Sequence, residues 1–203
     1  MRLWMTLAGL VALLAAGCGS APAAQQVRPG QSVAVFAGGC FWCTESDFDK
    51  VPGVISTTSG YTGGKLVNPS YEQVSAGNTG HIEAVRIVFD PKRVSYATLT
   101  NHFFRTVDPL DAGGQFCDRG YQYRSALFVT PAQRAAAEAA KTQAAARLGK
   151  PVATLILPAA TFYPAEDYHQ DYHSKNAVKY RFYRWNCGRD ARIKQVWGAA
   201  AAR

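Results

Sequence analysis

Short apolar runs and longer periodic segments predict that strands and helices are mixed along the chain after residue 31. Strands are predicted at 32–37, 81–90, 125–129 and 152–157, and helices at 40–48, 95–106 and 131–148. The last helix carries the clearest end signals, with Thr130 as its cap, Pro131 in first position and Gly149 at its end. The glycine-rich segment 57–64 predicts a turn. Because the elements do not alternate strictly, the pattern favours an α+β fold or a mixed two-layer α/β sandwich, not a doubly wound sheet.

The first 24 residues are typical of an export signal. Arg2 precedes an apolar run from Leu3 to Ala16, which is shorter than a bilayer span and ends in small residues. The residues before Cys18 resemble a bacterial lipobox, so Cys18 is the candidate for lipidation and membrane attachment; ordinary cleavage near Ala24 is the alternative. We therefore expect an exported protein of the periplasm or cell envelope, with residues 25–31 as a linker and 32–203 as one catalytic domain.

Composition narrows the class of protein further. The chain has 203 residues, of which 48% are hydrophobic, enough for one substantial core. The formal net charge is +8, yet no basic run is interleaved with aromatic residues, so we expect no nucleic-acid partner. Five cysteines are too few for a disulfide scaffold in a chain of this length.

The clearest local candidate for chemistry is Cys40, which follows two glycines at a predicted strand-to-helix junction. Backbone N–H groups and the helix dipole at such a junction stabilise a thiolate, which predicts a lowered pKa for Cys40. Cys40 and Cys43 also form a C-x-x-C pair, and two buried structural cysteines are the alternative. No second C-x-x-C exists, and the His169 and His173 segment lacks a His-Glu-x-x-His arrangement, so we expect no metal site.

Glu83 is the candidate acid. On the predicted strand it shares a face with apolar residues, which predicts a raised pKa and a carboxyl group that donates a proton at neutral pH; an edge position facing water is the alternative. Tyr71 and Tyr123 lie in or beside predicted turns, where their hydroxyl groups suit a pocket that holds one polar atom. Phe41 and Trp42 are the candidate apolar walls beside Cys40.

Taken in order, seven segments of the chain resemble the A-type peptide-methionine sulfoxide reductases over roughly residues 33–176. They are Gly39-Cys40-Phe41-Trp42, Pro52-Gly53-Val54, Gly60-Tyr61-Thr62-Gly63-Gly64, Asn68-Pro69-Ser70-Tyr71, Gly80-His81-Ile82-Glu83-Ala84-Val85, Gln122-Tyr123-Arg124-Ser125 and the segment from Phe162 to Gln170. The resemblance implies a two-layer sandwich with a ferredoxin-like core and reduction of the S epimer of methionine sulfoxide, free or in proteins.

The resemblance also implies a role for each candidate residue. Cys40 corresponds to the nucleophile that attacks the sulfoxide sulfur and becomes a sulfenic acid, and Glu83 to the acid that protonates the sulfoxide oxygen. Tyr71 and Tyr123 correspond to hydroxyl donors to that oxygen. The substrate-binding positions of the pocket correspond to Phe41, Trp42 and Asp118.

The chain departs from the family in its recycling cysteine. Many members carry one shortly after a Lys-Asn-Pro segment, but no cysteine follows Lys175-Asn176 closely here. The resolving candidates are Cys187, slightly favoured because its glycine-flanked tail suggests flexibility, and Cys43, within about one helical turn of Cys40. Cys117 is a third candidate, with simple burial as its alternative. The family uses an external dithiol of the thioredoxin type and no bound cofactor, and we expect a monomer.

Three other functions are consistent with parts of the sequence. A general thiol-disulfide oxidoreductase would use the Cys40/Cys43 pair and need no Glu83. A ligand-binding lipoprotein of the cell envelope would tolerate loss of Cys40. A cysteine hydrolase with His81 or His169 as its base would leave Glu83 without a role.

Overall fold

The computed structural model describes residues 27–201. The predicted export signal with its lipidation candidate Cys18, and the beginning of the predicted linker, lie outside the described residues. Within the part of the chain that is described, no helix is both long enough and apolar enough to cross a bilayer.

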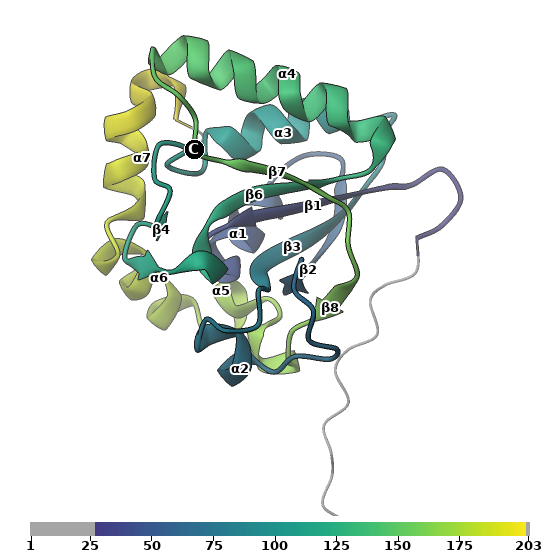
Figure 1. Ribbon diagram of the computed structural model, residues 1–203, viewed down its shortest axis with the longest axis vertical. Coiled ribbons are helices and arrows are strands. Elements are labelled where there is room, and N and C mark those ends of the chain that lie inside the picture. Colours follow the sequence, from purple (N-terminus) through teal and green to yellow (C-terminus); the bar gives the residue numbers. More distant parts are fainter. Residues whose placement is uncertain (1–26, 202–203) are drawn as a thin grey trace, which may run out of the picture.

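Six strands form one mixed sheet in the order β7-β6-β1-β3-β2-β8 (Figure 1). They are β1 (Ser32–Gly38), β2 (Val54–Thr62), β3 (Ile82–Phe89), β6 (Ser125–Val129), β7 (Leu155–Pro158) and β8 (Phe162–Pro164). Neighbouring strands are antiparallel except β6 and β7, which are parallel. Two very short strands, β4 (Gly114–Gln115) and β5 (Asp118–Arg119), pair separately as a small hairpin.

The α-helices are α1 (Phe41–Phe48), α2 (Tyr71–Ser75), α3 (Tyr96–Phe104), α4 (Pro131–Leu148), α5 (Tyr172–Lys175), α6 (Ala177–Asn186) and α7 (Arg189–Trp197), with short 3-10 turns at Tyr121–Tyr123, Asp167–His169 and Gly198–Ala200. Side chains from α1, α3, α4 and α7 share the main hydrophobic core with β1, β2, β3 and β6. Phe36 of β1, for example, lies with its ring centre 5.3 Å from that of Phe103 on α3. A smaller cluster around Phe128 covers the other face of the sheet. The predicted two-layer α/β sandwich with a mixed sheet is therefore confirmed.

The predicted bounds of several helices and strands agree with the structure. The helix predicted at 131–148 is α4, with the Thr130 N–H donating to Gln133 Oε1 at 3.1 Å and Gly149 left-handed at a φ of 61°. The strand predicted at 125–129 is β6. The strand predicted from residue 152 begins only at Leu155.

The predicted turn at 57–64 is wrong, because most of this segment belongs to β2. Gly60 lies inside the strand, opposite Pro164 of β8. A Cβ atom added at Gly60 would lie 2.5 Å from Cζ of Phe162, so a side chain would push β8 away. Glycine here permits a close approach between strands and does not mark a turn.

The predicted flexible tail around Cys187 is also wrong, because the chain forms two consecutive helices there. Cys187 ends α6, and Gly188, left-handed at a φ of 68°, lets the chain turn directly into α7. The sequence of α6 lacks the apolar periodicity that predicts a helix, because its large apolar side chains do not face the core: Phe182 is 64% exposed and Trp185 74% exposed.

Candidate active site

The junction between β1 and α1 places Cys40 at the N-terminus of a helix. Gly39 has a φ of 82°, and a Cβ atom added there would lie 2.6 Å from Cβ of Gln115. Only glycine therefore fits between the strand and the helix. Cys40 caps α1, and its carbonyl accepts the N–H of Cys43 at 3.1 Å.

A cavity of about 70 Å³ opens beside the Cys40 side chain. Its lining contains all seven residues predicted to act on or bind substrate, together with one that the sequence analysis missed: Cys40, Phe41, Trp42, Tyr71, Glu83, Asp118, Tyr123 and Tyr183. These residues come from β1–α1, α2, β3, the β4–β5 hairpin, the following 3-10 turn and α6. The fold thus joins the predicted residues, far apart in sequence, around one small space.

Glu83 lies inside the protein, as its apolar strand face predicts. It is 3% exposed, which excludes the alternative of an edge position facing water. The N–H of Phe41 donates to Oε2 of Glu83 at 3.0 Å and favours the ionised form, but burial outweighs this bond and raises the pKa of Glu83 to about 8. Glu83 is therefore mostly protonated at neutral pH and able to donate a proton.

The predicted lowering of the Cys40 pKa is wrong. Burial raises the pKa of the Cys40 thiol well above its ordinary value, and the neighbouring thiol of Cys43 and carboxyl groups of Glu83 and Asp118 raise it further. One of the backbone N–H groups at this junction, that of Phe41, is bonded to Glu83. In the resting site Cys40 is thus a neutral thiol.

Cys43 has the opposite tendency. Its hydrogen bond with Cys40 lowers the pKa of Cys43, and the positive charges of Arg189 and Arg184 lower it further. Asp47, one helical turn after Cys43, holds both guanidinium groups, with N–O distances of 2.7 Å to Arg184 and 3.4 Å to Arg189. Cys43 is the more acidic of the two buried thiols.

The tyrosine hydroxyl groups of the cavity are donors. Burial raises the pKa of Tyr71 to about 12 and also raises that of Tyr123, so both keep their protons at neutral pH. Glu166 fixes the start of α2, since its Oε1 accepts the N–H of Tyr71 at 2.9 Å. Its other oxygen accepts the hydroxyl of Tyr61, also at 2.9 Å.

Trp42 forms a fixed wall of the cavity. Its indole N–H donates to Nδ1 of His169 at 3.1 Å, and its ring stacks on Tyr172 with centroids 3.7 Å apart. Burial lowers the pKa of His169 to about 4, so this imidazole is neutral and accepts the bond. His81 accepts the Gly64 N–H at 3.1 Å through Nδ1. Neither histidine lines the cavity, so neither is placed as the base of a cysteine hydrolase.

Asp118 and Tyr183 close the remaining side of the cavity. The Tyr183 hydroxyl donates to Oδ2 of Asp118 at 2.6 Å. Burial raises the pKa of Asp118, although the bond from Tyr183 favours its ionised form. Tyr183 lies in the helix that the sequence analysis did not predict, and a tyrosine without a turn or motif around it gives no sequence signal of its own.

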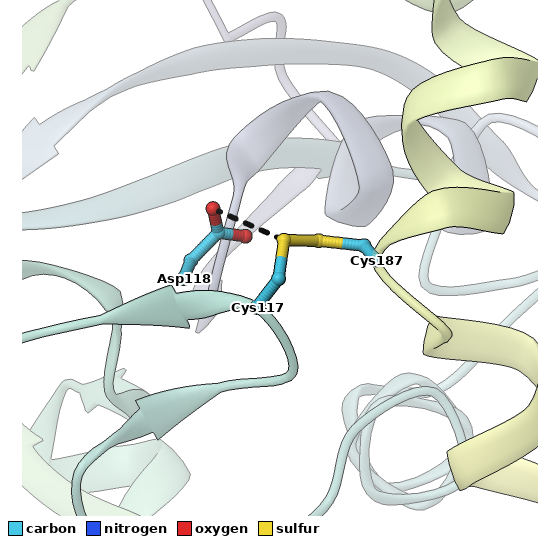
Figure 2. A group of neighbouring side chains, drawn as sticks. All are labelled: Cys117, Asp118 and Cys187. Atoms are coloured by element: carbon cyan, nitrogen blue, oxygen red, sulfur yellow. Dashed lines mark hydrogen bonds between the residues drawn. A yellow bond between two sulfur atoms is a disulfide. The ribbon is translucent and has the colours of Figure 1, made fainter.

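A disulfide joins Cys117 to Cys187 beside Asp118 (Figure 2). Cys117 is exposed, so its simple burial is excluded, whereas Cys40 and Cys43 are free and buried. Cys117, Asp118 and Cys187 form the one group among residues 27–201 whose ligand atoms lie close enough for a metal ion, all within 4.8 Å. Because metals bind thiolates, the disulfide leaves this group without two of its ligands.

Comparison with known proteins gives one consistent result. The family model described as peptide methionine sulfoxide reductase matches residues 32–201. The chain is 54% identical to peptide methionine sulfoxide reductase MsrA 2 of Caulobacter vibrioides, over 97% of this chain and 98% of that protein. A protein of the same name from Rhizobium meliloti is 53% identical, over 83% of this chain and 84% of its own length.

Solved structures agree with these relatives. The reduced form of Mxr1 from Saccharomyces cerevisiae is similar with a TM-score of 0.71 and 33% identity, covering 75% of this chain and 90% of that one. Methionine sulfoxide reductase A of Corynebacterium diphtheriae gives a TM-score of 0.66 and 34% identity, covering 74% of this chain and 77% of that one. The chain belongs to the peptide methionine sulfoxide reductase family.

Proposed function

We propose that this protein reduces the S epimer of methionine sulfoxide, free or in proteins, to methionine. The observation that carries the proposal is the common cavity of Cys40 and Glu83, in which a buried thiol and a protonated carboxyl group face the same aromatic-lined space. Such a cavity fits the methyl-sulfinyl end of an oxidised methionine, which has an apolar methyl group, an electrophilic sulfur and one strongly accepting oxygen.

The first step is attack of the Cys40 sulfur on the sulfoxide sulfur. A sulfoxide oxygen is a poor leaving group, so Glu83 donates a proton to it while the hydroxyl groups of Tyr71 and Tyr123 donate hydrogen bonds. Phe41 and Trp42 surround the methyl group. The oxygen ends on Cys40 as a sulfenic acid, methionine leaves, and the thiol proton of Cys40 restores Glu83, so atoms and charge balance.

The second step is resolution of the sulfenic acid, which we assign to Cys43. Cys187 already has a partner in Cys117, whereas Cys43 is free, contacts Cys40 and is the more acidic thiol of the pair. Attack by Cys43 forms the Cys40–Cys43 disulfide and releases water. This choice departs from the slight preference for Cys187 that the sequence alone suggested.

An external dithiol then reduces the Cys40–Cys43 disulfide and leaves as its own disulfide. Mxr1 of Saccharomyces cerevisiae has been solved in complex with Trx2, which supports a reductant of the thioredoxin type. We propose that the chain is exported, with lipid attachment at Cys18, and that its reductant is an exported thioredoxin-like protein. The proposed reaction uses no bound cofactor.

The decisive experiment measures dithiothreitol-driven turnover of the two separated methionine sulfoxide epimers. We expect consumption of the S epimer only. Consumption of neither epimer, or of both at equal rates, overturns the proposal. Reduction of insulin disulfides measured in parallel tests the alternative of a general thiol-disulfide oxidoreductase, for which insulin would be the better substrate and Glu83→Gln would have no effect.

A further inference from the structure

The Cys117–Cys187 disulfide has no part in the reaction proposed above, yet it lies beside Asp118, a residue of the cavity wall. Cys117 lies in the turn between β4 and β5, and Cys187 lies at the end of α6, 70 residues further along the chain. Figure 2 shows the bridge between these two elements, with the Asp118 carboxyl group beside it. The bond therefore connects two segments that otherwise belong to different parts of the fold.

Each cysteine of the disulfide is connected through the backbone to one residue of the cavity wall. Asp118 directly follows Cys117, and the N–H of Cys187 donates to the carbonyl of Tyr183 at 2.9 Å within the last turn of α6. The two wall residues meet in the 2.6 Å hydrogen bond from Tyr183 to Asp118. The disulfide and this hydrogen bond thus both join the β4–β5 hairpin to α6. The hydrogen bond lies in the cavity wall, and the disulfide lies outside it.

The β4–β5 hairpin is held at its β4 end by Gln115, which is buried and whose side chain accepts the N–H of Asp108 at 2.9 Å and donates to the carbonyl of Asp108 at 2.7 Å. The β4–β5 hairpin has two residues in each strand and pairs with no other strand. Phe116, next to Cys117, lies under the guanidinium group of Arg189 at 4.6 Å, a contact that connects the hairpin to α7. Cys117 itself is exposed in the turn beyond Gln115, and there the disulfide adds a covalent restraint to these weaker contacts.

We infer that the Cys117–Cys187 disulfide is a redox-sensitive latch of the substrate cavity, which holds Asp118 against Tyr183 and tightens substrate binding. This inference rests on the function proposed above. A dithiol reduces the latch by exchange: two hydrogens pass to the cysteine sulfurs, and the reductant becomes a disulfide. The sulfur of Cys117 is 3.8 Å from Oδ1 of Asp118, whereas Tyr183 donates to Oδ2, so a freed thiol would be a second donor to the same carboxyl group.

Cys117 and Cys187 are positioning residues in this account, because they act through Asp118 and Tyr183. Loss of the latch should weaken binding of the sulfoxide and leave the chemistry at Cys40 nearly unchanged. A purely structural bridge would change the stability of the protein but would not separate binding from the rate at saturation.

The test is single-turnover formation of methionine from a methionine S-sulfoxide peptide in the Cys43→Ser background, without reductant. Mass mapping of alkylated peptides verifies the state of each cysteine. We expect Cys117→Ser/Cys187→Ser to raise the half-saturating peptide concentration about tenfold, as for one weakened charged hydrogen bond, with less than about a twofold change in the saturating rate. In a Tyr183→Phe background, the same double substitution should change half-saturation less than about twofold, because the bond is already lost.

Reduction of the exposed disulfide in the Cys43→Ser protein, followed by removal of the reductant, provides a second test that does not depend on the folding of the double variant. We expect the same increase in half-saturation and its reversal on reoxidation. Unchanged half-saturation, or an equal effect in the Tyr183→Phe background, overturns the latch while the proposed function stands. Failure of every variant, including the disulfide-containing protein, to form methionine overturns the proposed function instead.

Discussion

The backbone N–H of Phe41 donates a 3.0 Å hydrogen bond to Oε2 of Glu83, so the start of α1 is attached to the carboxyl group that faces Cys40. One bond aligns the nucleophile with its acid and removes a donor that would otherwise stabilise a thiolate. Glu83 still has a raised pKa, because one backbone hydrogen bond does not replace the hydration lost on burial.

The protonation state of Glu83 predicts the pH dependence of oxygen transfer. The reaction needs the protonated acid, and the pKa of Glu83 is about 8, so the single-turnover rate should be level near pH 6 and fall above about pH 8. Glu83→Gln should lower this rate roughly 10²- to 10⁴-fold and remove the decline. Glu45→Gln is the matched control: Glu45 is buried with a similar pKa but lies outside the cavity lining. A rate that rises through pH 8 contradicts the assignment.

Glu45 provides a separate prediction for stability. Burial raises the pKa of Glu45 to about 8, so the folded protein holds this proton over a range in which the unfolded chain releases it. The stability contributed by the protonated group is full below about pH 4.5 and declines as the pH rises to about 8. Glu45→Gln should therefore increase the free energy of unfolding by a few kcal/mol at pH 8 relative to its effect at pH 4.5. Denaturant unfolding at both values measures the difference; a substitution effect independent of pH would refute it.

If Cys43 resolves the sulfenic acid, the Cys43→Ser and Cys187→Ser variants should differ in turnover. Cys43→Ser should form about one methionine per protein and then stop with a thioredoxin-type reductant, because its Cys40 sulfenic acid has no adjacent thiol. Trapping with a sulfenic-acid-specific probe and mass spectrometry should find the label on Cys40. Cys187→Ser should continue to turn over with the same reductant. The reverse pattern, in which Cys187→Ser stops after one methionine, would assign recycling to Cys187.

Arg189 should be a main stabilising contact between α7 and the rest of the fold. Its guanidinium group is buried and donates to the Gly38 carbonyl at 3.0 Å and to the Thr106 carbonyl at 2.8 Å, beside Asp47. Arg189→Met leaves these acceptors and the Asp47 charge with fewer partners, and should cost about 3–5 kcal/mol of unfolding free energy. The exposed Arg181 on α6 is the control, with an expected change of about 0.5 kcal/mol or less for Arg181→Met. Equal effects would mean that Arg189 has no special role.

Site residues that can be recognised from their neighbours along the chain were predicted correctly. Cys40 after two glycines, Glu83 on an apolar strand face and Tyr71 beside a turn were all identified from neighbours within a few positions. All seven predicted residues line the cavity. Tyr183 was missed because its partner Asp118 is 65 residues away and the intervening sequence contains no sign of the contact.

By itself, the sequence predicted the fold class, strands β1, β3, β6 and β7 and helices α1, α3 and α4, because these follow from apolar periodicity and turn chemistry. Local motifs and the family resemblance together pointed to seven residues of the cavity. Tertiary structure alone decided the protonation of Cys40, the partner of Cys187 and the place of Tyr183. The physical reason is that desolvation, disulfide pairing and long-range hydrogen bonds depend on which distant segments pack together, and neighbours along the chain carry no record of that packing.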